Sequence, residues 1–188
     1  MKREKLDKLL NDADIEDIIA ADFEKDRYQL HIIDHTDKLI YAAGETDFVF
    51  GGFYIMRKSS LTKAKSVLNK TNKSRIILRE IGFVDKLDIP VINLSSWENI
   101  FKALKKMKCL VCISNFEPGT KHFFYLGRVT KVKKHSVRIA YVTADGDWYF
   151  NEKIPYNEIT KIQFKDSYSV EWENYLKRHR IYDEVIYP

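Results

Sequence analysis

The strongest constraint on the fold is the regular alternation of short apolar or aromatic segments with turn-forming residues. Such segments cover residues 17–23, 28–33, 38–43 and 50–56 in the first half, and residues 109–115, 123–132, 137–142, 148–153 and 159–164 in the second. They are rich in β-branched and aromatic residues and are shorter than typical helices. The pattern therefore predicts a mainly β protein built from short antiparallel strands.

The turns between these segments and the helices that flank them can also be predicted from the sequence. Glu117-Pro118-Gly119 predicts a tight turn, residues 133–136 a polar hairpin loop, and Asp145-Gly146 a hairpin. Residues 2–11 have the spacing of a short amphipathic helix, and a second helix follows from the capping-box pair Ser95 and Glu98 to about residue 107. Residues 168–176 predict a closing helix that covers an edge or a barrel mouth.

The secondary structure of two segments near the middle of the chain is predicted from weaker patterns. Residues 61–73 are basic and place Leu61, Ala64 and two further apolar residues at helical spacing, whereas residues 76–84 suggest one more strand. Gly82 and Pro90 frame a boundary between the halves. We therefore expect two domains, residues 1–88 and 89–188, each with its own core.

Charge is distributed unevenly along the chain. The net charge is +5, yet residues 48–144 carry 19 basic and five acidic side chains, and the acidic excess lies in the two flanks. Such segregation favours a polyanionic partner, unless the acidic flanks fold against the basic middle. No segment has the apolar length of a membrane span or an export signal, and two cysteines form no disulfide framework. These features predict a cytoplasmic protein.

The two halves share a faint internal repeat. Residues 51–55 can be aligned with residues 146–150, and Leu61-Thr62-Lys63-Ala64 with Ile159-Thr160-Lys161-Ile162. In each half an aromatic strand leads through a polar connection to a Thr-Lys pair, as a duplicated unit would.

A helix followed by five curved strands resembles the Sm-like small β-barrel of RNA-binding proteins. Residues 125–132, Tyr-Leu-Gly-Arg-Val-Thr-Lys-Val, are similar to the first Sm motif, in which Gly127 would let the strand bend. The resemblance implies two small, strongly bent, antiparallel Sm/SH3-like barrels in tandem with flanking helices, an arrangement also found in certain bacterial proteins. Lys133 and Arg138 replace the Asp and Asn of the family's uridine pocket, and its Ile-Arg-Gly motif is absent.

Other motifs have simpler interpretations. His31 and His35 resemble a zinc-peptidase pair, but the alternation around His31 predicts a strand, with His35 in the turn that follows it. Cys109 and Cys112 are interpreted as small core residues of another strand. Residues 148–150, Trp-Tyr-Phe, resemble the WYL domain of bacterial regulators, although a buried aromatic strand explains them more simply. With no phosphate loop, nucleophile elbow or dinucleotide fingerprint, we expect no enzyme, cofactor or metal.

The leading hypothesis is a binding module that places a basic, aromatic-edged surface against RNA or single-stranded DNA. The alternative is a protein-interaction or self-assembly module that pairs through exposed edge strands. The candidate residues for nucleic acid are Arg57, Lys58, Tyr125, Lys131, Lys133, Lys134 and Arg138.

Overall fold

The computed structural model describes residues 3–11, 17–22, 27–66, 73–179 and 181. These residues are mainly β structure, as expected, and the described strand pairs within each half are antiparallel. The chain divides into two compact units, Met1–Val91 and Ile92–Pro188. The first unit extends past residue 88 because the segment after its last helix packs back on it: the Tyr41 hydroxyl donates to the Pro90 carbonyl at 3.0 Å.

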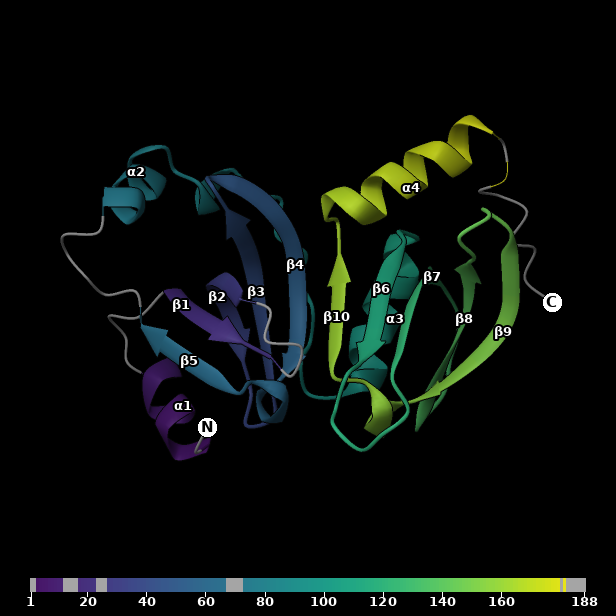
Figure 1. The fold of residues 1–188 in the computed structure, drawn as a ribbon, viewed down its shortest axis with the longest axis horizontal. Helices are drawn as coiled ribbons and strands as arrows, with labels where there is room; N and C mark the ends of the chain where they lie inside the picture. Colours follow the sequence, from purple (N-terminus) through teal and green to yellow (C-terminus); the bar gives the residue numbers. More distant parts are fainter. Residues whose placement is uncertain (1–2, 12–16, 23–26, 67–72, 180, 182–188) are drawn as a thin grey trace. The chain divides into compact units, whose positions relative to one another are not determined.

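The first unit contains a five-stranded sheet with the order β5-β1-β2-β3-β4 (Figure 1). Helix α1 covers its core, as its apolar face predicts, because Leu6 and Leu10 are buried against residues such as Leu30 and Met56. In chain order the elements are α1 (Arg3–Leu10), β1 (Asp17–Ala21), β2 (Arg27–His35), β3 (Leu39–Thr46), β4 (Val49–Arg57), the 3₁₀ turn η1 (Lys58–Ser60), β5 (Lys63–Ser66), α2 (Lys73–Glu80) and η2 (Val84–Lys86).

The second unit repeats this plan, with the strand order β10-β6-β7-β8-β9. Helix α3 packs on β7 and β8 and buries Ile100, Phe101 and Leu104, while α4 runs across one end of the sheet (Figure 1). Its elements are α3 (Trp97–Met107), β6 (Val111–Asn115), β7 (Phe123–Val132), β8 (Ser136–Val142), β9 (Trp148–Pro155), η3 (Tyr156–Glu158), β10 (Lys161–Phe164) and α4 (Ser167–Arg178).

The repeat extends to individual hydrogen bonds around the fifth strand of each unit. The backbone N–H and the hydroxyl of Thr62 both donate to the Ala21 carbonyl, at 2.8 and 3.1 Å. The same two groups of Thr160 both donate to the Ser114 carbonyl, each at 3.0 Å. The alignment of Leu61–Ala64 with Ile159–Ile162 is therefore confirmed.

The other half of the predicted alignment is out of register. The ends of β4 and β9, Arg57 and Pro155, both precede the 3₁₀ turn, so Phe53 corresponds to Asn151 rather than to Trp148. Gly51 lies inside β4, whereas Gly146 lies in the turn before β9. The alignment of residues 51–55 with residues 146–150 is therefore wrong, because the Gly-aromatic pattern on which it rests pairs a strand glycine with a turn glycine.

Two predicted elements in the middle of the chain are wrong. The helical pattern of residues 61–73 gives way to β5, in which Ala64 pairs with Ala20 of β1; residues 67–72 lie outside the described part of the chain. The predicted strand at residues 76–84 is instead helix α2 followed by η2, with Leu78 buried. In the first case pairing with β1 overrides the local helical pattern.

The predicted turns of the second unit are confirmed, and the predicted N-cap of its first helix lies one residue later than expected. Turns occur at residues 117–120, 133–136 and 143–146, and the last contains Gly146 at φ +89°. The N-cap of α3 is Ser96, whose hydroxyl accepts from the Asn99 N–H, rather than Ser95.

The described pairings do not close either sheet into a barrel, because the first and last strands of each order do not pair with each other. Within the described residues, none of the helices has the length and apolar character needed to cross a membrane.

Candidate functional site

Three basic side chains form a row across three adjacent strands of the second unit. Lys131 of β7 lies directly opposite Arg138 of β8, and Arg138 lies directly opposite Lys153 of β9. Side chains opposite each other on antiparallel strands have Cβ atoms about 5 Å apart, so all three point to the same face of the sheet. We call Lys131, Arg138 and Lys153 the basic row.

A β-bulge creates this row. The register between β7 and β8 shifts between Val129 and Lys131, so one extra residue of β7 faces β8 at this point. Without the bulge, Lys131 would point to the same face as Val129, which is buried in the core. The bulge therefore turns the lysine out to the face that carries Arg138.

Little in the described part of the chain neutralises the basic row. Lys131 and Lys153 are exposed, and Arg138 is half-buried, with Nη1 donating to the Asn151 carbonyl at 3.1 Å. No described ion pair joins any of the three to a carboxylate. Like charges directly opposite each other destabilise a sheet, so the row works against folding.

The hairpin loop between β7 and β8 extends the positive surface. Lys133 and Lys134 are both exposed in this loop, which is closed by the Lys133 N–H donating to the Ser136 carbonyl at 2.9 Å. One acidic group lies near it: the pKa of Glu98 is lowered mainly by Lys102, its ion-pair partner at 2.6 Å, and further by Lys134. Four of the seven predicted residues, Lys131, Lys133, Lys134 and Arg138, are thus brought to one hairpin.

Lys58 does not form part of a binding surface. Its side chain is only 4% exposed, and its Nζ forms an ion pair with Asp7 of α1 at 2.6 Å. It therefore holds α1 against the 3₁₀ turn, which corrects its assignment as a phosphate-binding residue. Arg57, its neighbour, ends β4 of the first unit. Both residues belong to the first unit, and the basic row belongs to the second.

Tyr125 lies on the opposite face of the second sheet from the basic row. Its hydroxyl donates to Glu152 at 3.3 Å, and Glu152 precedes Lys153 on β9, so the two side chains point to opposite faces. Its ring contacts Tyr141 at 4.7 Å, and Tyr141 contacts Tyr149 at 5.0 Å. Partial burial and then Glu152 raise the pKa of Tyr125. The aromatic group and the basic row are therefore separate surfaces.

The histidine pair lies within a strand, the turn expected at His35 included, whereas the cysteine pair straddles the start of one: Cys112 is buried on β6, and Cys109 precedes β6 and is partly buried. His31 and His35 both lie on β2, and the His31 ring packs against the Phe83 ring, with centroids 5.0 Å apart and planes tilted by 34°. Both cysteines are free thiols, and burial raises the pKa of Cys109 to about 11 and also raises that of Cys112. Across the described ranges, no three His, Cys, Asp or Glu side chains gather in a way that could hold a metal ion.

Sequence reasoning missed Lys153 and the exposure of residues 149 and 150. Lys153 becomes recognisable once the Asp145-Gly146 hairpin fixes the register between β8 and β9. Tyr149 is 53% exposed and Phe150 43% exposed, which corrects the expectation of a buried aromatic strand. No protein-family model matches the chain, and searches of curated proteins and of solved structures find no match either.

Proposed function

We propose that this protein is a non-enzymatic binding module that holds single-stranded nucleic acid on the β7–β9 face of its second unit. The observation that carries the proposal is the basic row, Lys131, Arg138 and Lys153, with Lys133 and Lys134 beside it. A row of opposed cations costs folding free energy, and a phosphate backbone bound across it would remove that repulsion.

The plan of each unit supports a small barrel of the Sm-like type. Both units place a helix before four strands, a 3₁₀ turn and a fifth strand that pairs back with the first. Gly127 supports the comparison, because a Cβ atom there would lie 2.2 Å from the Ala140 carbonyl oxygen, where β7 and β8 approach closely. We take the tandem barrel as the architecture behind the proposed module.

The proposed binding chemistry differs from uridine recognition by the Sm family. Lys133 and Arg138 stand where that family has its Asp and Asn, and Tyr125 points away from the basic row. The proposed interface therefore reads the phosphate backbone, and we expect little preference for base sequence and a steep dependence on salt.

Edge-strand pairing with another protein is the less favoured function. β9 ends the strand order of the second unit, yet it carries an outward Lys153, a left-handed residue at Asn151 (φ +68°) and a terminal Pro155. Lysines, bulges and prolines at an edge all discourage the addition of another strand. β5, which begins the strand order of the first unit and is the counterpart of β10, also exposes two lysines, Lys63 and Lys65.

The test is titration of RNA and single-stranded DNA at low salt with the wild type and with the triple variant Lys131→Gln, Arg138→Gln, Lys153→Gln. Each phosphate contact contributes about −0.7 to the slope of log K against log salt for single strands, so the triple variant should flatten the slope by about 2. A matched control neutralises three exposed cations elsewhere in the second unit, Lys106, Lys121 and Arg178.

The control separates a site from bulk charge, since both variants change the net charge equally. Equal losses in the two variants would refute the basic row as the interface, and no binding by the wild type would refute the proposal altogether. Urea unfolding gives a second readout: Lys153→Gln should raise stability by about 0.5 kcal/mol because it removes an opposed like charge. If Lys153 stabilised the fold instead, Lys153→Gln would lower the free energy of unfolding.

A further inference from the structure

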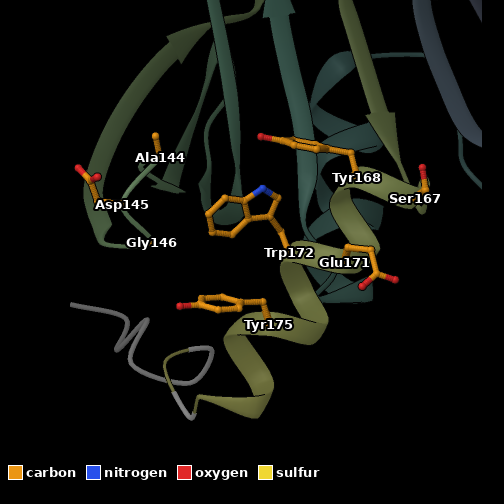
Figure 2. A pocket seen from close by; sticks show the side chains of 8 residues that line it. All are labelled: Ala144, Asp145, Gly146, Ser167, Tyr168, Glu171, Trp172 and Tyr175. Atoms are coloured by element: carbon orange, nitrogen blue, oxygen red, sulfur yellow. The ribbon is translucent and has the colours of Figure 1, made fainter.

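A hollow of about 580 Å³ lies in the second unit at the far end of the β8–β9 hairpin from the basic row (Figure 2). One side is the hairpin turn, with Asp145 and Gly146, and the other is helix α4. Arg138 and Ala144 are six residues apart on β8 and its turn, which is about 20 Å of extended chain. The hollow is therefore distinct from the proposed nucleic-acid surface.

Three aromatic rings from one face of α4 line this hollow. Tyr168, Trp172 and Tyr175 follow one another at spacings of four and three residues, which places them on a single helix face. Figure 2 shows Trp172 between the two tyrosines, with the turn residues across from it. Its ring meets that of Tyr175 edge to face, with centroids 5.9 Å apart.

These rings are only partly used in folding. Leu176 of this helix covers the end of the sheet, since it is fully buried beside Leu110 and Leu126, and Trp172 packs partly against the same cluster. By contrast, Tyr168 is 49% exposed and Tyr175 is 41% exposed. Both rings line the hollow and keep part of their surface exposed, and the Tyr175 ring also contacts the His179 ring, with centroids 4.4 Å apart.

The charged groups of the hollow are acidic. Asp145 and Glu171 line it, both are exposed, and its lining contains no Lys, Arg or His. The amino end of α4, which would otherwise favour an anion, is capped by Asp166, whose Oδ1 accepts from the Ser169 N–H at 2.8 Å. Charge therefore favours a cationic ligand over an anionic or neutral one.

We infer that this aromatic hollow binds a quaternary ammonium group. Ring faces carry negative potential and attract a cation with a soft, poorly hydrated surface, and several rings with an adjacent carboxylate are the usual way to hold an alkylated ammonium. The volume lies within the range of about 300–1,000 Å³ that small-ligand pockets occupy. The inference does not depend on the proposed nucleic-acid binding.

Calorimetric titration with choline, with a short peptide containing trimethyl-lysine, and with 3,3-dimethylbutan-1-ol tests this site. The alcohol has the shape of choline without its charge, so choline should bind at least about tenfold more tightly. Equal affinity for choline and for the peptide supports a site that recognises the quaternary ammonium group alone. Tighter binding of the peptide supports an alkylated lysine side chain of a protein as the source of that group. No binding of either cation, or equal binding of the alcohol, overturns the inference.

Variants locate the binding in the hollow. Tyr168→Ala should weaken choline binding about tenfold and Asp145→Asn several-fold, because one removes a ring face and the other a carboxylate. Both side chains are exposed, so the fold should persist, which circular dichroism checks. Glu158→Gln, an exposed carboxylate of η3 outside the hollow, is the matched control. If Glu158→Gln weakens binding as much as Asp145→Asn, choline binds by general charge and the site is refuted.

Discussion

Replacing Gly127 by alanine should destabilise the second unit by about 3 kcal/mol, the upper end of the range for overpacking a close contact. A Cβ atom there would lie 2.2 Å from the Ala140 oxygen and 2.7 Å from the Tyr141 Cα. Both are backbone atoms of β8, so no side-chain rotation relieves the clash and the two strands must separate. At an m-value of about 1.5 kcal/mol/M, the urea midpoint falls by about 2 M.

Tryptophan fluorescence follows this unit alone, because all three tryptophans lie after residue 92. The control is Gly119→Ala, where a Cβ atom meets nothing within 4 Å but φ is +79°. Its cost is backbone strain alone, roughly 1 kcal/mol. If Gly127→Ala is no more destabilising than Gly119→Ala, the close approach of β7 and β8 does not constrain the fold as we argue.

Three further outcomes are expected. Thr160→Val should lower the free energy of unfolding in urea by about 1 kcal/mol and Thr62→Val by less, because both lose a hydroxyl hydrogen bond but Thr160 is buried and Thr62 is exposed; a larger loss for Thr62→Val would contradict this reasoning. Asp7→Asn should lower the free energy of unfolding by about 3 kcal/mol, measured by urea unfolding followed by circular dichroism, and Lys58→Met should lower it less. Only Asp7→Asn leaves the buried charge of Lys58 without its ion-pair partner, so the opposite order would refute the role of the ion pair. The Cys109 thiol should react with a disulfide reagent at pH 8 about 100-fold more slowly in the folded protein than in urea, because burial and Glu173 raise its pKa to about 11. The raised pKa also makes stability depend on pH: the folded state is favoured fully below the unfolded pKa of the thiol, and this advantage is lost as the pH rises toward 11.

The candidate site was only partly predictable. The basic middle segment and a hairpin loop are visible in the sequence, and they locate Lys131, Lys133, Lys134 and Arg138. Which face each residue occupies depends on the bulge between Val129 and Lys131, and a shift of one residue moves a side chain to the other face of a sheet. For that reason Tyr125 was grouped with cations that lie on the opposite face, and Lys153 was overlooked.

The exposed aromatic residues of α4 show the same limit in a helix. Their spacing predicted the helix and one apolar face, but not how far that face would be covered. Coverage depends on the hairpin turn at Asp145 and Gly146, more than twenty residues earlier in the chain.

Local chemistry alone determined the antiparallel strands, their turns and the helices at residues 97–107 and 167–178, because alternation, capping and glycine placement act within a few residues. Tertiary structure decided the rest. Ala64 became part of a strand because β1 offered an open edge, Lys58 became an internal ion pair because α1 placed Asp7 beside it, and three cations became one row because a bulge and two hairpins set their register. Such outcomes depend on partners distant in the chain, whose positions exist only once the sheet has formed.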